Sequence, residues 1–186
     1  MSSALRKPTR MTFDEYLAFE ETATIRHELI DGMLFAMSGG TDAHSLICTN
    51  LTLAIAGPLL GKCQVFQAGM KLKVEHAHES DGYYPDIMVS CDPTDRERMF
   101  RKAPLLLIEV LSPSTERLDR GEKKLNYLQI PSLQEYVLVA QDKPKVEIMR
   151  RRTSWTVEEL YPGDTLTLES MDLALPLSDI YRTIVF

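Results

Sequence analysis

The chain has 186 residues, of which 44% are hydrophobic and 26% charged, as is ordinary for a soluble globular protein. This length predicts a single domain over residues 1–186. No apolar run approaches the ~20 residues that a membrane-spanning helix needs, and the polar start "MSSALRKPTR" lacks the pattern of a signal peptide. We therefore expect a cytoplasmic protein that does not associate with membranes.

The formal net charge of -6 argues against tight non-specific binding to nucleic acid, which needs a basic surface. It leaves room for a small acidic, metal-filled site beside a local basic patch. The three cysteines, Cys48, Cys63 and Cys91, are widely spaced and form no CxxC pair that would suggest zinc or redox chemistry. This use of cysteine favours a reducing, intracellular compartment.

The first third of the chain predicts a helix, a hairpin and a second helix. "PTRMTFDEYLAFEE" predicts a helix in which Thr12 is the N-cap and Glu15 completes a capping box. In "RHELIDGMLFAMS" two short apolar stretches flank Asp31-Gly32, a strong hairpin signal. "TDAHSLICTNLTLAIAGPLL" predicts a second helix. Its apolar positions, expected to be buried, are Leu46, Ile47, Leu51, Leu53 and Ile55.

The remaining segments mostly predict strands. In chain order they are "CQVFQAG", "KLKV", "YYPDIMVS", "APLLLIEVL", "EYVLVA", "KVEIMRR" and "SWTVEEL". A helix, "RLDRGEKKLNYLQI", separates the fourth from the fifth. This order predicts an α/β fold with a mixed central sheet flanked by helices, an N-terminal helix and hairpin, and C-terminal strands.

The strand "LLLIEVL" carries Glu109 among apolar neighbours, where an ionised carboxylate is costly unless it is paired. Asp86 opens the preceding apolar strand. If the two strands are neighbours, both carboxylates can converge on one oxygen-preferring cation such as Mg²⁺. The alternative is structural: Asp86 caps a strand end and Glu109 pairs with an Arg or Lys.

Pro85-Asp86 followed by Glu109 in "IEVLSPST" resembles the PD-(D/E)xK nuclease superfamily. More narrowly, the chain is similar over nearly its whole length to the restriction-endonuclease-like family labelled "putative restriction endonuclease". The resemblance implies a restriction-endonuclease-like core and a DNA endonuclease that depends on Mg²⁺ or Mn²⁺, with Asp86 and Glu109 as metal ligands and catalytic residues. A homodimer is expected, because cutting both DNA strands takes two sites.

The sequence departs from the superfamily pattern at the catalytic lysine, whose place two residues after Glu109 holds Leu111. The following helix offers a replacement, because Asp119, Lys123 and Tyr127 recur at a spacing of four and share one stripe. The narrower family's pattern places its lysine at Lys123, which we expect to be catalytic. The alternative is a surface Asp119–Lys123 pair without catalytic meaning.

Three further residues are possible accessories. Glu28 resembles an acid that some relatives add to the metal site, although a solvated charge is the simpler interpretation. His44 could contact phosphate or metal, or be satisfied by neighbouring backbone, and Gln67 could point into the site from its strand.

Two other functions compete with the endonuclease. A catalytically silent nuclease fold that serves as an interaction module is favoured by the negative charge and the absent strand lysine. A two-carboxylate glycosidase would need a sugar-stacking aromatic cleft that the sequence does not reveal.

Overall fold

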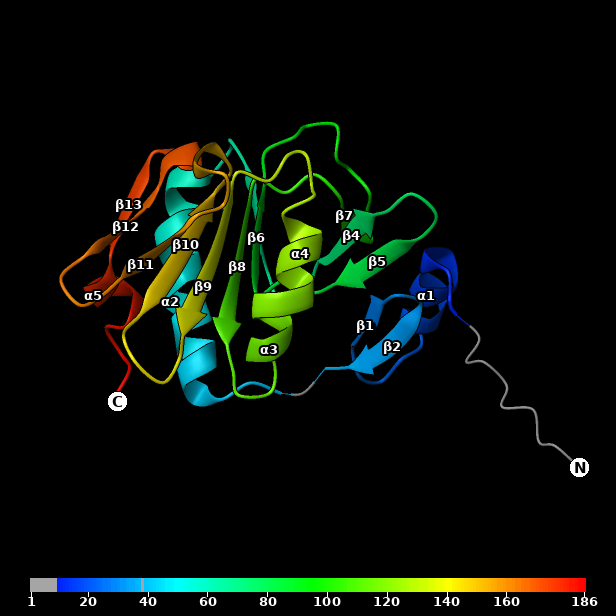
Figure 1. Ribbon diagram of the computed structural model, residues 1–186, viewed down its shortest axis with the longest axis horizontal. Coiled ribbons are helices and arrows are strands. Elements are labelled where there is room, and N and C mark those ends of the chain that lie inside the picture. The colour runs from blue at the N-terminus through cyan, green and yellow to red at the C-terminus, as the bar shows by residue number, and fades with distance from the viewer. Residues whose placement is uncertain (1–9, 38) are drawn as a thin grey trace, which may run out of the picture.

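The computed structural model describes residues 10–37 and 39–186, which form a mixed α/β fold with two mixed sheets and few helices (Figure 1). Most of the polar start, where no signal peptide is expected, lies outside the described residues. Within the described ranges, no helix combines the length and apolar character needed to cross a membrane.

The first sheet has five strands. In spatial order they are β2 (Met33–Ala36), β1 (His27–Ile30), β5 (Ser80–Tyr83), β4 (Lys71–Glu75) and β7 (Phe100–Arg101). The predicted β1–β2 hairpin is confirmed, and its turn residues Asp31 and Gly32 both have positive φ, at 50° and 72°. Only the β4–β7 pair is parallel.

Helix α1 (Phe13–Glu20) packs against this first sheet. The predicted capping box is confirmed, because the Thr12 hydroxyl accepts from the Glu15 N–H and the Glu15 carboxylate accepts from the Thr12 N–H. Tyr16 lies over Gly82 of β5, where an added Cβ would be 2.5 Å from the tyrosine ring. Glycine at this position therefore allows α1 to approach the sheet closely.

The second sheet has six strands and forms the centre of the molecule (Figure 1). In spatial order they are β11 (Val157–Leu160), β10 (Val146–Arg150), β9 (Glu135–Ala140), β8 (Leu106–Leu111), β6 (Ile87–Ser90) and β3 (Gln64–Gln67). β8 and β9 are parallel and the other pairs are antiparallel. The predicted mixed central sheet is thus confirmed.

Both faces of β8 are covered, which explains its nearly continuous apolar sequence. On one face, Ile108 and Val110 share a core cluster with residues of α2 (Asp42–Leu59). On the other, Leu107 and Leu111 share a cluster with Tyr127 from the helical segment after β8. Glu109 belongs to this second face by strand alternation.

The helical segment after β8 is continuous over residues 116–127. It consists of α3 (Glu116–Leu118), a π-helical turn η1 (Asp119–Lys123) and α4 (Lys124–Tyr127). It ends three residues before the predicted end at Ile130. π-helical turns are rare and are frequently found at functional sites.

The C-terminal part carries elements that the sequence analysis missed. They are the 3₁₀ turns η2 (Arg151–Thr153) and η3 (Glu169–Met171), the hairpin β12 (Thr165–Leu168) and β13 (Leu173–Pro176), and α5 (Leu177–Ile180). Leu166, Leu175 and Ile180 join the α2 side of the core. These short segments therefore complete the cover of that face.

Two expectations about the elements are wrong. Leu46 and Leu53 of α2 are 39% and 62% exposed, because the helix buries only the stripe that faces the sheet. "YYPDIMVS" is not one strand: β5 ends at Tyr83 and β6 begins at Ile87. The chain crosses from the first sheet to the second between these residues, which places Asp86 at the junction.

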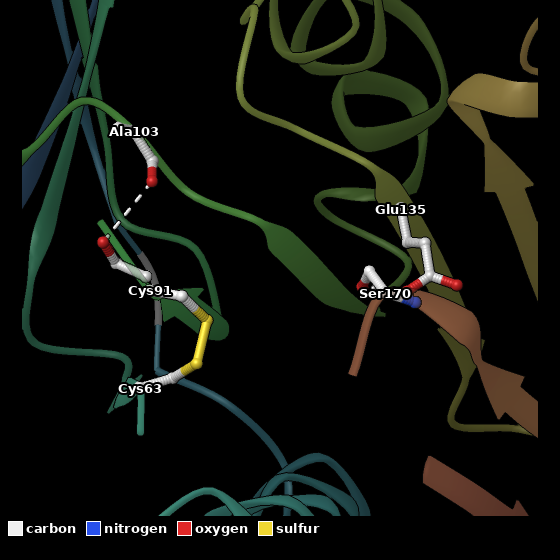
Figure 2. Close-up of a disulfide and its surroundings, with 6 residues drawn as sticks. Cys63, Cys91, Ala103, Glu135 and Ser170 are labelled. Atoms are coloured by element: carbon white, nitrogen blue, oxygen red, sulfur yellow. Dashed lines mark hydrogen bonds between the residues drawn. A yellow bond between two sulfur atoms is a disulfide. The ribbon is translucent and has the colours of Figure 1, made fainter. Parts of the chain in front are cut away.

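A disulfide joins Cys63 and Cys91, which flank β3 and β6 (Figure 2). The cysteines are 28 positions apart in sequence, and their spacing gave no sign of the pairing. They meet because β3 and β6 are adjacent and antiparallel, with Gln64 opposite Ser90. The remaining cysteine, Cys48, is buried and free.

Candidate active site

Asp86 and Glu109 lie next to each other where the two sheets meet. β6 and β8 are antiparallel neighbours with Ile87 opposite Ile108, so the condition for convergence of the two acids is met. The Asp86 N–H donates to Glu109 Oε2 at 3.3 Å, and Asp86 Oδ2 accepts from the Val110 N–H at 2.8 Å. The Val110 N–H on β8 therefore holds the Asp86 carboxylate beside Glu109.

Lys123 enters the site from the π-helical turn. Its Nζ lies 3.0 Å from Glu28 Oε1, 3.2 Å from Asp119 Oδ1 and 3.4 Å from Glu109 Oε1. Lys123 is 4% exposed and Asp119 is 1% exposed, so the alternative of a surface pair is wrong. The superfamily position, Leu111, is packed in the core cluster beside Tyr127.

Two tyrosine hydroxyls hold the helical segment against strands β8 and β9. The Tyr127 hydroxyl donates to Glu109 Oε1 at 2.9 Å, and the Tyr136 hydroxyl donates to the Asp119 carbonyl at 3.0 Å. Asp119, Lys123 and Tyr127 thus all face the site, as their spacing predicts. Residues four apart drift by about 40° around a regular α-helix, and the wider π-helical turn offsets part of that drift.

Burial changes the ionisation of these side chains. It raises the pKa of Glu109 well above its ordinary value, with Lys123 offsetting part of the effect, and it also raises the pKa of Asp119 and Glu28. Burial alone would lower the pKa of Lys123, but the surrounding carboxylates raise it well above its ordinary value. The site therefore holds an ammonium and more acid than that ammonium neutralises.

The donor set fits a hard divalent cation. The buried or half-buried carboxylates at the site are Glu28, Asp86, Glu109 and Asp119. Against these four acids the described residues place one lysine, whose ammonium lies within 3.4 Å of three of them. Carboxylate oxygens are the ligands that Mg²⁺ and Mn²⁺ prefer. Asp86 and Glu109 are the acids on which such an ion would be held.

His44 lies in the first turns of α2 beside these acids, with Nε2 3.1 Å from Asp86 Oδ2. This hydrogen bond raises the pKa of His44. Cys48 lies one helical turn later. It was not identified from the sequence as a site residue, although its spacing of four from His44 places both residues on one face of the helix. Its Sγ lies 3.8 Å from His44 Nδ1, so the two partners face different ring nitrogens. Burial also raises the pKa of the Cys48 thiol, which disfavours a thiolate ligand.

Of the two remaining accessory candidates, Glu28 lies at the site and Gln67 does not. Glu28 is 5% exposed and not a solvated charge: its Oε1 is close to Lys123 and accepts from the Tyr84 N–H at 3.2 Å. Gln67 is exposed and accepts from the Thr52 hydroxyl at 3.2 Å, so the structure does not bring it to the acids.

A cavity of about 80 Å³ opens beside the acids. Its lining residues are Met37, Gly39, Gly40, His44, Tyr84, Asp86, Glu109, Ser112, Thr115, Asp119 and Lys123. Tyr84, Ser112 and Thr115 were not singled out from the sequence as site residues. Ser112 and Thr115 belong to the "SPST" that follows β8, and this motif could have indicated them.

Comparison with a solved structure supports the fold. The crystal structure of a "putative nuclease belonging to DUF820" from Anabaena variabilis superposes with a TM-score of 0.76 at 21% identity, covering 92% of this chain and 98% of that one. At this identity the likeness concerns the fold alone.

Comparison with sequences identifies relatives. The chain is 34% identical to the uncharacterized protein slr1290 of Synechocystis sp. over 95% of this chain and 94% of that one. It is 35% identical to the uncharacterized protein sll1609 of the same organism, over 86% and 92%. The model of the Uma2 family, described as "Putative restriction endonuclease", matches residues 13–178. The chain therefore belongs to the Uma2 family.

Proposed function

We propose that this chain is a metal-dependent endonuclease that hydrolyses phosphodiester bonds in DNA, built as one domain with a restriction-endonuclease-like core. The observation that carries the proposal is the position of Lys123, 3.4 Å from Glu109, which compensates for Leu111 in the superfamily's lysine position. Membership of the Uma2 family supports the same function.

Each side chain has a distinct role in this proposal. Asp86 and Glu109 would hold Mg²⁺ or Mn²⁺. When bound, that ion supplies Lewis-acid polarisation of the phosphate and a lowered pKa of its water. The Lys123 ammonium orients the attacking water or stabilises the charge that develops on the phosphate.

The surrounding residues position these groups. Glu28 and Asp119 hold the Lys123 ammonium, and the Tyr127 hydroxyl holds Glu109 Oε1. His44 lies against Asp86 Oδ2 and limits the rotation of that carboxylate. A homodimer would supply one such site for each strand of a duplex.

A plasmid-nicking assay tests the proposal. Wild-type protein should nick plasmid DNA with Mg²⁺ or Mn²⁺ and stop when EDTA is added. Asp86→Asn and Glu109→Gln should each lower the rate by about 10²-fold or more, because they remove charge from the ion's ligands. Asp142→Asn, at an exposed acid outside the cavity, is the matched control and should nick like wild type. If wild-type protein does not nick DNA with either metal, the proposed endonuclease activity is wrong and the catalytically silent interaction module is favoured.

A further inference from the structure

Lys71, at the start of β4, is a nearly buried cation that the proposed mechanism does not use. It is only 7% exposed. Among the residues that the structure describes, no carboxylate oxygen lies within 4.0 Å of its ammonium, and no side-chain hydrogen bond joins it to a partner. Burial lowers the pKa of Lys71, as expected of an ammonium without a paired acid. A buried ammonium is costly to the fold unless an anion pairs with it.

A second cation shares the surroundings of Lys71. The Lys71 Nζ lies 5.2 Å from the centroid of the Tyr84 ring, and the Arg26 guanidinium carbon lies 5.5 Å from the same centroid. Arg26 is exposed and also donates to the Ala68 carbonyl. Two positive side chains therefore gather around one aromatic ring.

Glu20 and Glu21 are the acids whose charges act on Lys71, and the Glu20 carboxylate already accepts hydrogen bonds from other groups. Glu20 Oε1 accepts from the His27 N–H at 3.1 Å and lies 2.9 Å from His27 Nδ1. Glu20 Oε2 accepts from the Tyr84 hydroxyl at 2.7 Å. Both Glu20 oxygens thus accept from other donors, and among the described residues Glu20 forms no ion pair with Lys71 or Arg26, so both cations keep hydrogen-bond donors for an external anion.

Two residues of the cavity lining, Tyr84 and Met37, connect this pair to the candidate active site. Tyr84, whose ring lies beside both cations, lines the cavity that also holds Asp86 and Glu109. Met37, which lines the same cavity, donates its N–H to the Arg26 carbonyl at 2.9 Å. A DNA strand with one phosphate in the candidate active site could therefore place a neighbouring phosphate against Lys71 or Arg26.

We propose that Lys71 and Arg26 bind the sugar–phosphate backbone of the DNA strand next to the phosphate that is cleaved. This inference rests on the proposed function and extends it with a binding subsite. A protein of net charge -6 cannot rely on a generally basic surface, so a few placed cations must carry its phosphate contacts. Lys71 and Arg26 then position the strand and take no part in the chemistry.

The test measures binding without cleavage. A fluorescein-labelled duplex is titrated in EDTA over a series of salt concentrations, and affinity is followed by fluorescence anisotropy. Lys71→Gln and Arg26→Gln should each weaken binding by about tenfold. Each should also reduce the slope of log affinity against log salt by about 0.9, the value for one lost phosphate contact to duplex DNA. Arg26 is exposed, so Arg26→Gln tests the inference even if Lys71→Gln folds poorly.

Lys73→Gln is the matched control. Lys73 lies on the same face of β4 and also lies over aromatic rings, 5.1 Å from the centroid of Phe13 and 5.7 Å from that of Phe100. Unlike Lys71 it has an acid partner, Glu75 at 3.2 Å, and its aromatic neighbours do not line the cavity. Lys73→Gln should leave both the affinity and the salt slope unchanged.

Three results would overturn the inference. Affinity and slope equal to wild type in both Lys71→Gln and Arg26→Gln would do so, as would an equal loss in Lys73→Gln. Wild type that fails to bind the duplex would also do so. The nicking assay on the same preparations tests the proposed endonuclease function separately. Cleavage by wild type would support that function even if the binding subsite is wrong.

Discussion

Lys123 Nζ lies 3.4 Å from Glu109 Oε1, although the two residues are 14 positions apart on different elements. Glu109 comes from the central strand β8, and Lys123 comes from the π-helical turn that follows it. Glu109 thus remains on this face of β8, while Leu111, the next residue on the same face, packs in the core. A lysine from the next element reaches the same carboxylate.

Lys123→Ala should lower the nicking rate by about 10²-fold or more, because a positioned cation beside the developing charge is lost. The same change leaves Glu28, Glu109 and Asp119 buried without their ammonium. We therefore expect metal-free protein to lose about 3–5 kcal/mol of stability, measured by urea unfolding. Rates should be compared at a temperature where the variant is folded.

Lys124→Ala is the control for this prediction. Lys124 is the next residue on the helix, about 100° further round, and is half-buried; among the described residues, the ion pairs to the three acids come from Lys123. It should cleave and unfold like wild type. Equal cleavage by wild type and both variants would contradict the role of Lys123.

The pH dependence of stability should identify Glu109 as a buried acid that holds a proton. Burial raises the pKa of Glu109 well above its ordinary value, so the folded state binds the proton more tightly than the unfolded state does. The stability that comes from this proton binding is fully present below the pKa of Glu109 in the unfolded state. It is lost as pH rises through the pKa of Glu109 in the folded state. Glu109→Gln stays neutral throughout, so its stability should increasingly exceed that of wild type as pH rises above about 4.5 in metal-free buffer.

Glu147→Gln provides a comparison in which the pH dependence of stability has the opposite sign. Burial acts to raise the pKa of Glu147, but hydrogen bonds from Arg120 and Lys145 bring it below its ordinary value. The stability from Glu147 is therefore present above the unfolded pKa and lost as pH falls, so Glu147→Gln should destabilise at neutral pH. Urea midpoints of both variants across pH check the pair. Curves of the same sign would show that the environments of the two acids are misassigned.

Much of the fold could be predicted because its signals are local. The Thr12–Glu15 capping box, the Asp31-Gly32 turn and the apolar strand around Glu109 each depend on a few consecutive residues. The division into two sheets could not be predicted, because Pro85 and Asp86 interrupt an apparently continuous strand only where the chain changes sheet. The Cys63–Cys91 pairing likewise follows from strand order, which sequence spacing does not encode.

The candidate site was partly predictable for the same reason. Spacing alone brought Asp119, Lys123 and Tyr127 onto one face. The convergence of Asp86 and Glu109 was expected only if their strands were neighbours, and the pairing of β6 with β8 meets that condition. The burial of Glu28 was not predictable, because it depends on how the first sheet meets the second. The catalytic roles of these residues stay predictions that the kinetic experiments address.

Reducing the Cys63–Cys91 disulfide should destabilise the protein by about 3–4 kcal/mol. The bridge closes a loop between residues 28 positions apart, and opening it restores that much conformational entropy to the unfolded chain. Denaturant midpoints with and without reductant measure the effect. The Cys63→Ser/Cys91→Ser double variant should resemble the reduced wild type and be insensitive to reductant. A reductant effect of equal size in that variant would exclude the disulfide as its cause.

Mg²⁺ and Mn²⁺ should stabilise wild type against thermal unfolding, because an ion that binds only the folded state shifts the equilibrium by mass action. At a concentration about 100 times its dissociation constant the gain is about 2.7 kcal/mol. Asp86→Asn should lose most of this gain, since its carboxylate is one of the two expected to hold the ion. Zn²⁺ should have no special advantage, because the thiol near the site among the described residues, that of Cys48, is kept protonated by burial. Equal stabilisation of wild type and Asp86→Asn, followed by calorimetry at matched ion concentrations, would place the cation somewhere other than between Asp86 and Glu109.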